Sequence, residues 1–501
     1  MLPLFTVILS FLGALIVGLT PPAHLNRIRW TALLTAGAGL VVAGLAVWHY
    51  EISSGGMQSV MTFPWIPALD IQFKTGVDGV SLALLLLTGL IAVCGVLFSW
   101  DITHRCNEFF AFFLALIGGV YGVFLSLDLV LLFVFYEIAI VPKYFLIAIW
   151  GSTRREYAAM KLVLYSFSSS ALVLLGLLAL YFGTDLHSFD LTRLAAEAHY
   201  AASFQIIVFP LVFVGFAVLA GMWPFHTWAP TGHVAAPTAA SMLLAGVVMK
   251  LGAYGCLRVA IGLLPLGAQY WAQWIAWIAV INILYGALVA LVQTDFKFVI
   301  GYSSVSHMGF VLLGLATLTA NGLTGAVLQM FSHGIIGALL FALVGGSIYR
   351  RTHTRQLGDY DRLVDRMPAI TWIFIVAGLA SMGMPGFSGF VAELHVLIGA
   401  WAQPALSTGI LVVTGLGILA TFAYTLIKIH EAFFRNSSVP ADPEHPRPDH
   451  YPALTWLETT AIFILAATAV GVGLFPWPLI QLIQTGLAPL LHTLSNGSVN
   501  P

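Results

Sequence analysis

About fourteen long apolar segments constrain this chain more than any other feature of its sequence. Each is roughly 18 residues or longer, the length that a helix needs to cross the hydrocarbon of a bilayer. The composition agrees, because 59% of the residues are hydrophobic and only 8% are charged. The approximate limits of the segments are 2–19, 31–49, 79–100, 109–126, 129–150, 157–183, 205–222, 237–264, 271–293, 298–318, 322–349, 369–400, 407–434 and 453–482.

These segments predict an all-α polytopic membrane protein. In lipid, a backbone finds its hydrogen bonds only within a helix or a closed barrel, and the segments lack the alternation of barrel strands. The linkers between them are too short for a separate soluble domain. Segment 2–19 has no basic start, and Pro21 and Pro22 follow it in place of a small-residue cleavage site, so we expect it to be retained as a span.

Basic residues in the loops predict the orientation. Loops after odd-numbered segments hold thirteen, and loops after even-numbered segments hold only Lys74 and Arg193. Since cytoplasmic loops carry the excess of Lys and Arg, we expect a bacterial inner-membrane protein with both termini in the periplasm. The larger set is Arg27, Arg29, Arg105, Arg154, Arg155, Lys297, Arg350, Arg351, Arg355, Arg362, Arg366, Arg435 and Arg447.

Charge and cysteine usage argue against several classes of function. The net charge is -1 and no basic run occurs, so a nucleic-acid partner is not expected. Cys94, Cys106 and Cys256 have no spacing suited to a disulfide framework, zinc or an iron–sulfur cluster. His226 and His233 lack a carboxylate or cysteine at ligand spacing, so a metal site is not expected either.

Proline and glycine interrupt two of the apolar segments in a similar way. The interruptions, 221–226 (GMWPFH) and 383–389 (GMPGFSG), lie five segments apart, so the matching helices run in opposite directions. Discontinuous helices at matching positions of inverted repeats indicate a transporter's ion site near the membrane midplane. The alternative is a pair of ordinary proline kinks.

Ionisable side chains inside the segments suggest a path for protons. A charge at the bilayer centre costs on the order of 2.5–3.5 kcal/mol, so each needs a partner, water or a function. A single buried histidine more often forms a helix–helix hydrogen bond, but histidines can relay protons between lysines and carboxylates. Lys161 and Lys428, near segment ends, are predicted to extend toward the interface. The deep set is Glu137, Lys250, His307, His333 and Glu393.

Five stretches of the sequence carry a family resemblance. They are FYEIAIVPKYFLIAIWG, PFHTWAPTGHVAAPTAASMLLAGVVMKLGAYG, QTDFKFVIGYSSVSHMGF, QMFSHGIIGALLF and GMPGFSGFVAEL. They resemble the antiporter-like subunits of proton-pumping NADH:quinone oxidoreductase, respiratory complex I, and the resemblance covers about residues 75–435. The glutamate, rather than lysine, after the second interruption favours the chain M (subunit 4) branch.

The resemblance implies a fold of fourteen helices with two inverted five-helix repeats and two broken helices. In this chain the division would be 1–106 for helices 1–3, 107–264 for the first repeat, 265–435 for the second, and 436–501 for the C-terminal loop and helix 14.

The resemblance also implies roles for residues at matching positions. Glu137 would be the input-side switch and Lys250 the central proton carrier. His307 and His333 would relay protons to Glu393, the exit or hand-over group. Three further residues fall within family motifs and would have supporting roles: Asp128, His226 and Lys297.

The chain departs from the family pattern near Glu137. Leu219 stands where the family has the lysine that pairs with this glutamate, and Thr231 replaces the aspartate of a Trp-Leu-Pro-Asp turn. Lys143 stands where the family has an uncharged residue. It is either a relocated partner of Glu137 or a lysine that extends to the interface or a neighbouring subunit. In an undistorted helix, six residues separate the two faces by about 120°.

The predicted function is proton translocation by a membrane-arm subunit, coupled to NADH oxidation and quinone reduction in other subunits. No cofactor is expected in this chain; NADH, FMN, iron–sulfur clusters and quinone would bind partner subunits, and antiporter-like chains would flank it in the bilayer. The alternatives are a subunit of a multi-subunit cation/proton antiporter, an ion-translocating membrane hydrogenase, and a scaffold that moves no ions. The loss at Leu219 would suit a variant chain or a second paralogue.

Overall fold

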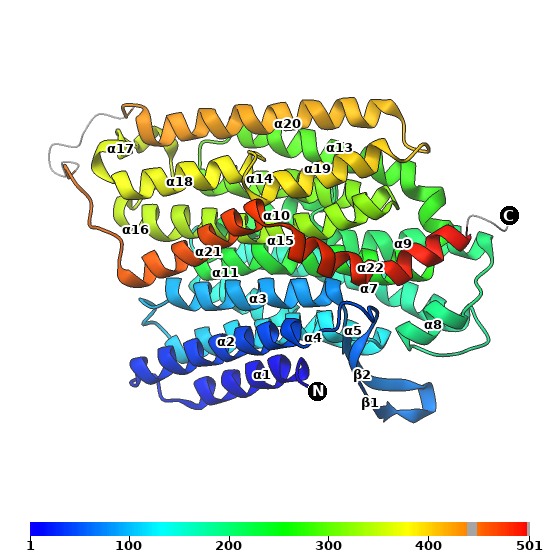
Figure 1. The fold of residues 1–501 in the computed structure, drawn as a ribbon. Helices are drawn as coiled ribbons and strands as arrows, with labels where there is room; N and C mark the ends of the chain where they lie inside the picture. Colours follow the sequence, from blue (N-terminus) through cyan, green and yellow to red (C-terminus); the bar gives the residue numbers. More distant parts are fainter. Residues whose placement is uncertain (438–447, 498–501) are drawn as a thin grey trace.

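The computed structural model describes residues 1–437 and 448–497. Long helices lie side by side in one bundle, which the chain crosses from α1 and α2 at one edge to α20 at the other (Figure 1). The last two helices, α21 and α22, return over the bundle and pack against α3 and α15.

The α-helices account for most of the described chain. They are α1 Leu4–Leu19, α2 Leu25–Trp48, α3 Gly79–Phe98, α4 Cys106–Leu125, α5 Leu129–Ile138, α6 Ile140–Trp150, α7 Arg155–Phe182, α8 Leu191–Glu197, α9 Ala202–Ala220, α10 Trp228–Ala235, α11 Thr238–Leu243, α12 Met249–Gly255, α13 Pro265–Val292, α14 Phe296–Ala316, α15 Ala320–Phe341, α16 Tyr349–Thr352, α17 Leu363–Arg366, α18 Pro368–Ser381, α19 Ser388–Trp401, α20 Thr408–Ile429, α21 Trp456–Leu474 and α22 Trp477–Gly497.

Short helical segments of other geometry join or extend these helices. Three have 3₁₀ geometry: η1 Pro67–Leu69, η2 Phe225–Thr227 and η6 Leu357–Asp359. Four have π geometry: η3 Leu244–Val248, η4 Cys256–Ile261, η5 Ala342–Ile348 and η7 His430–Phe434. Two of the π segments, η4 and η7, end the eighth and thirteenth predicted spans.

The helices confirm the predicted class of a polytopic helical membrane protein. Twelve helices in the described part of the chain are long and apolar enough to cross a membrane. Three apolar helices are shorter: α1, α18 and α19. The last two, α18 and α19, lie on either side of the second predicted interruption. Together these positions coincide with the fourteen apolar segments of the sequence.

Two features differ from the sequence expectation. The linker before α3 forms an antiparallel hairpin, β1 Gln58–Ile66 and β2 Ile71–Val77. The final apolar segment, 453–482, is two helices, because the chain breaks between α21 and α22 at Phe475 and Pro476. Gly473 lets this break pack closely, since a Cβ there would lie 2.2 Å from the carbonyl oxygen of Gly386. The last break therefore touches the second predicted interruption.

Aspartate N-caps repeat one structural device in both halves of the chain. Asp128 caps α5 and Asp295 caps α14, each accepting hydrogen bonds from the first backbone N–H groups. Each cap also joins a distant loop through an isolated antiparallel bridge, Asp128 to Asp190 and Asp295 to Gln356. The backbone N–H groups of the residues that follow the caps donate to the carbonyl oxygens of Phe189 and Arg355. In return, a backbone N–H of each loop donates to the carbonyl oxygen of the residue before the cap. The two halves are thus fastened in the same way.

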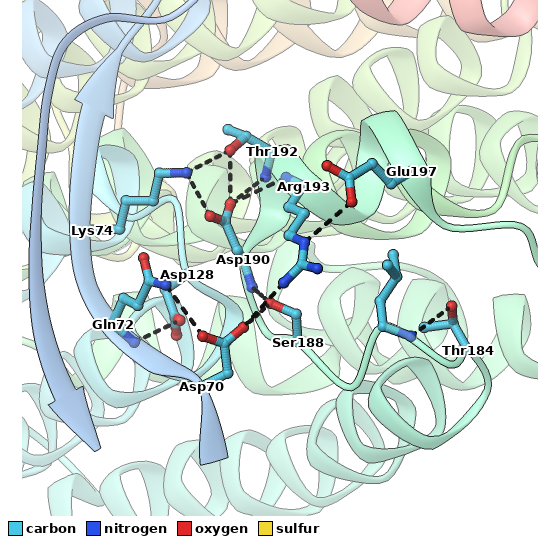
Figure 2. A network of polar contacts seen from close by, with 11 residues as sticks. Asp70, Gln72, Lys74, Asp128, Thr184, Ser188, Asp190, Thr192, Arg193 and Glu197 are labelled. Atoms are coloured by element: carbon cyan, nitrogen blue, oxygen red, sulfur yellow. Dashed lines mark hydrogen bonds and ion pairs between the residues drawn. The ribbon is translucent and has the colours of Figure 1, made fainter. Parts of the chain in front are cut away.

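A polar network holds the β-hairpin against the bundle (Figure 2). Lys74 of β2 makes an ion pair of 2.5 Å with Asp190, the N-cap of α8, and donates to Thr192. Burial acts to raise the pKa of Asp190, but these hydrogen bonds outweigh it and hold the pKa below its usual value. The Gln72 backbone N–H donates to Asp128, and Ser188 donates to Asp70. The hairpin is therefore fixed to both α5 and α8.

Arginines gather at the opposite end of the bundle. Arg350 pairs with Asp101, and Arg351 pairs with Glu458 of α21 at 2.9 Å. Arg355 pairs with Asp295 at 3.3 Å. Arg447, one of the basic residues used to predict orientation, lies outside the described residues. We refer to this part as the arginine-rich end.

Candidate functional site

Lys250 lies at the centre of the bundle on α12 and is 0% exposed. Its ammonium group is 2.5 Å from the carbonyl oxygen of Ala245 and 2.7 Å from Nδ1 of His333. The Ala245 oxygen belongs to η3, whose π turns leave carbonyl groups without their usual α-helical partners. The lysine therefore has one fixed acceptor and one neighbour that can exchange a proton.

His333, His307 and Glu393 continue this chain of contacts across three helices. The rings of His333 on α15 and His307 on α14 have centroids 5.6 Å apart. His307 Nδ1 lies 3.5 Å from Oε1 of Glu393 on α19. All three side chains are buried. The structure thus brings four predicted residues, Lys250 included, into one line of neighbours.

A small cavity lies beside the second half of this line. It measures about 10 Å³, close to the least space that holds one water molecule. His307, His333 and Glu393 line it together with three polar side chains, Gln329, Ser332 and Ser381. A single water in this cavity would have several hydrogen-bonding neighbours, as a proton relay requires.

The second interruption shapes the surroundings of Glu393. Gly383 has φ +73°, and a Cβ there would lie 2.5 Å from Oε2 of Glu393. Only glycine therefore lets the carboxylate sit against the broken backbone. Ser381, the last residue of α18, lies 3.1 Å from Nε2 of His307, and Ser388 of α19 lies 2.7 Å from Ser332. The break places two hydroxyls beside the line of titratable residues.

Asn282 of α13 satisfies the backbone at the first interruption. It accepts from the Trp223 N–H at 2.5 Å and donates to the carbonyl oxygens of Gly221 and Val305. His226 follows the break, is buried, and packs its ring against Tyr285 with centroids 5.0 Å apart. Neither ring nitrogen of His226 has a hydrogen-bond partner among the described residues.

Glu137 and Lys143 flank a break that the sequence did not predict. The fifth span is two helices, α5 and α6, which meet at Ala139. The angle expected between the faces of Glu137 and Lys143 in one undistorted helix therefore does not apply to these two residues. Lys143 is 1% exposed, so the alternative that it extends to the interface is wrong within this chain. Among the residues that the structure describes, its Nζ and the Oε1 of Glu137 are buried without hydrogen-bond partners, and their charges act on each other.

The remaining predicted residues lie apart from the central line. Asp128 caps α5, and burial raises its pKa to about 6. Lys297 is buried near the start of α14 and donates to the carbonyl oxygen of Ala236 at 3.0 Å. Leu219 is an ordinary buried residue of α9.

The two lysines predicted to extend toward the interface both have polar partners. Lys161 donates to Thr231 at 3.3 Å, at the position where the family has an aspartate. Lys428 is 5% exposed and pairs with Glu431 at 2.8 Å. Lys161 is half-buried, and the partner of Lys428 is itself partly exposed, with 27% of the Glu431 side chain accessible.

Sequence reasoning missed several polar residues of the site. Ser381, Gln329 and Asn282 have no charge to mark them, and only tertiary packing brings them to the breaks and histidines. His233 was considered only as a metal ligand. It is 0% exposed, and within the described part of the chain neither ring nitrogen has a hydrogen-bond partner. Among residues 1–437 and 448–497, no group of three His, Cys, Asp or Glu side chains is arranged to hold a metal ion.

Comparison with known proteins places the chain in a family. Residues 126–419, more than half of the chain, match the family described as "NADH:quinone oxidoreductase/Mrp antiporter, TM". The chain belongs to this family. The NAD(P)H-quinone oxidoreductase chain 4 of Acaryochloris marina is 39% identical over 94% of this chain and 88% of its own length. A chain 4 of Synechococcus sp. strain JA-3-3Ab is 38% identical, with 94% and 89% covered.

Solved structures of the family share the fold. A chain of respiratory complex I from Thermus thermophilus superposes with a TM-score of 0.86 at 25% identity, covering 97% of this chain and 99% of its own. A chain of the Mrp complex from Dietzia sp. gives a TM-score of 0.83 at 22% identity, with 99% of both chains covered. At that lower identity, the second likeness supports the fold alone.

Proposed function

We propose that this chain is a membrane-arm subunit of an NADH:quinone oxidoreductase and moves protons across the membrane. The observation that carries the proposal is the line Lys250, His333, His307, Glu393, in which the two histidine rings have centroids 5.6 Å apart and line one small cavity. Its polar contacts are 2.7 Å from the lysine to the first histidine and 3.5 Å from the second histidine to the glutamate. The chain 4 relatives support the redox partner, since they are named NAD(P)H-quinone oxidoreductase subunits.

Each residue of the line has a role that its position allows. Lys250 is the central carrier, because the one side chain hydrogen-bonded to its ammonium among the described residues is a histidine that can take its proton. His333 and His307 pass the proton on through their two ring nitrogens. Glu393 is the exit or hand-over group, because its carboxylate lies against the break between α18 and α19. The small cavity beside His307 supplies the space for water.

Glu137 and Lys143 form the input-side pair in this proposal. Lys143 supplies the positive charge for Glu137 that Leu219, at the family's lysine position, cannot supply. A buried ammonium and a buried carboxylate oxygen without hydrogen-bond partners are costly unless the two charges stabilise each other. Movement at the break between α5 and α6 would change the distance between them, and with it the proton affinity of each. Asp128, His226 and Lys297 support this path at its edges.

The proposal includes an orientation and an assembly. The arginine-rich end faces the cytoplasm of a bacterial cell, so both termini lie in the periplasm. Residues 107–264 and 265–435 are inverted repeats, which the matching Asp128 and Asp295 locks support. Antiporter-like chains flank the subunit. NADH, FMN, iron–sulfur clusters and quinone bind other subunits, so this chain has no redox site of its own.

Replacing Lys250 tests the function directly. In membrane vesicles that contain the native complex, Lys250→Met should lower the number of protons moved per NADH oxidised, because methionine fills the space but carries no proton. Glu393→Gln should act in the same direction. Lys161→Met is the control, since Lys161 lies outside the line.

Three outcomes separate the proposal from its rivals. Normal assembly with unchanged proton yield in both Lys250→Met and Glu393→Gln would indicate a scaffold. Loss of sodium/proton exchange without any change in NADH oxidation after deletion of the chain would indicate a cation/proton antiporter. Co-purification with hydrogenase subunits would indicate the hydrogenase module.

A further inference from the structure

The last turns of α20 carry a buried charge that the proposed path does not use. Lys428 lies within one turn of the π segment η7 and pairs with Glu431, whose side chain is 27% exposed. The side chain of Lys428 itself is only 6% exposed. The ion pair thus joins a group in the interior to one that reaches solvent.

Lys428 opens onto a cavity of about 30 Å³ between α14, α18 and α20. That volume holds about two water molecules. One part of the wall is polar, with Ser303, Tyr424, Thr425 and Ser381 beside Lys428, and the rest is apolar. The Tyr424 hydroxyl donates to Ser303 at 2.7 Å. The Thr425 hydroxyl is buried and has no hydrogen-bond partner among the described residues. A water molecule in the cavity would supply that hydrogen bond.

Ser381 connects this cavity to the central line. It lines both the 30 Å³ cavity and the smaller cavity that contains Glu393. Its hydroxyl lies 3.1 Å from Nε2 of His307. Because a hydroxyl both donates and accepts, Ser381 can pass a proton from water on one side to the histidine on the other.

The outer end of the cavity lies at the arginine-rich end. The segment after α20 is fastened there, since the Arg362 N–H donates to the carbonyl oxygen of Arg435. The cavity therefore lies between Lys428, toward the arginine-rich end, and Ser381, which contacts His307 in the second half of the chain. The input pair Glu137 and Lys143 lies in the first half.

We propose that α20 provides a second proton-uptake route from the arginine-rich face, running from Glu431 and Lys428 through the Tyr424–Thr425 cavity and Ser381 to His307. The route rests on the proposed function, because His307 must carry protons for it to matter. It lets His307 and Glu393 be reprotonated without a proton passing through Lys250.

Radiolytic hydroxyl-radical footprinting of the purified complex tests whether water occupies the cavity. Radicals formed from bound water oxidise adjacent side chains, so Tyr424 should be modified several-fold faster than Tyr121. Tyr121 is a matched control, because it is 1% exposed and its hydroxyl is buried without a partner. Equal, slow modification of the two tyrosines would overturn the proposal.

A matched pair of variants tests whether the route carries protons. Thr425→Val removes a hydroxyl that lines the cavity, and Lys428→Met removes its charge. Both should lower the protons moved per NADH. Thr421→Val removes a hydroxyl one turn away, which bonds only to the carbonyl oxygen of Gly417 and lines no part of the cavity, so its yield should equal that of the parent.

Lys250→Met, measured in parallel, separates this inference from the proposed function. If Lys250→Met lowers the proton yield and both Thr425→Val and Lys428→Met leave it unchanged, the α20 route is wrong and the central line stands. If none of the three changes the yield, the proposed function itself fails.

Discussion

At the scale of single residues, the chain keeps buried charges only where another titratable group is near. Lys250 meets His333, and Glu393 meets His307. Lys143 has the charge of Glu137 nearby, but among the described residues its ammonium has no hydrogen bond. A buried charge without a hydrogen bond is destabilising, so its retention points to a role in function.

Replacing Lys143 tests whether it is the partner of Glu137. In Lys143→Met and Lys143→Ala we expect fewer protons moved per NADH, because Glu137 loses its partner. The thermal midpoint of the complex should fall in both variants, because the Glu137 carboxylate is left buried without the charge that stabilises it. Full proton yield in both variants would show that Lys143 is not the relocated partner.

At the scale of elements, the breaks in helices matter more than the helices themselves. Gly383 and Gly386 both have positive φ in the break between α18 and α19, but their surroundings differ. A Cβ on Gly383 would meet the Glu393 carboxylate, whereas a Cβ on Gly386 would meet nothing within 4 Å. Gly383 is therefore needed both for the backbone conformation and for the space that Glu393 occupies, whereas Gly386 is needed for the backbone conformation alone.

This difference predicts distinct effects for two alanine variants. Each should cost roughly 1–2 kcal/mol of stability, because a side chain disfavours the left-handed conformation. Gly383→Ala should also lower proton yield toward that of Glu393→Gln, since the carboxylate is displaced. Gly386→Ala should keep the parent yield. Proton yield per NADH and the thermal midpoint of the complex measure both effects, and equal yields in the two variants would contradict the argument.

The β-hairpin should stay docked until the pH falls below about 4. Asp190 has a pKa held below its usual value of 3.8, so its contribution is present above that pH and is lost as the pH falls through the lowered value. Asp128, whose pKa is raised to about 6, is protonated first on acidification, which favours the folded form.

Hydrogen exchange of residues 58–77, corrected for intrinsic rates, measures this docking. Protection should hold or increase slightly from pH 7 to pH 5 and decrease below 3.8. Lys74→Met should be less protected at every pH, because Asp190 and Thr192 lose their common partner. Loss of protection between pH 5 and pH 6 in the parent would contradict the assignment.

At the scale of the whole molecule, charge is sorted between the two ends of the bundle. The arginine-rich end holds most of the basic loop residues, and the hairpin end holds Lys74 and Arg193 in local ion pairs. Such sorting sets the direction of insertion.

Reporter fusions test the orientation. Alkaline phosphatase, which is active only in the periplasm, should be active when joined to the C-terminus and inactive when inserted after His353 in the arginine-rich end. A fluorescent protein that matures only in the cytoplasm should give the reverse pattern. The same signal at both positions would contradict the proposed topology.

The sequence by itself determined the membrane class, the order of the helices and the family. Apolar segments long enough to span a bilayer leave the backbone one solution, so Leu2 to Leu474 could be divided into spans with little ambiguity. The deep charges Lys250 and Glu393 were visible for the same reason, because charged residues are rare in such segments. The β-hairpin was missed, since strand pairing depends on a partner that periodicity does not reveal.

Only the tertiary structure decided which polar groups meet. Lys428 and Lys143 lie near predicted span ends, where sequence favours the interface, yet packing buries both. Ser381 and Asn282 carry no charge and lie outside the quoted motifs, and Gln329 lies in one but carries no charge. Their contacts with His307 and with the first interruption therefore depend on how α13, α14, α15 and α18 lie together. The physical reason is that membrane insertion selects for length and polarity, which are local properties, whereas a proton path depends on distances between helices far apart in the chain.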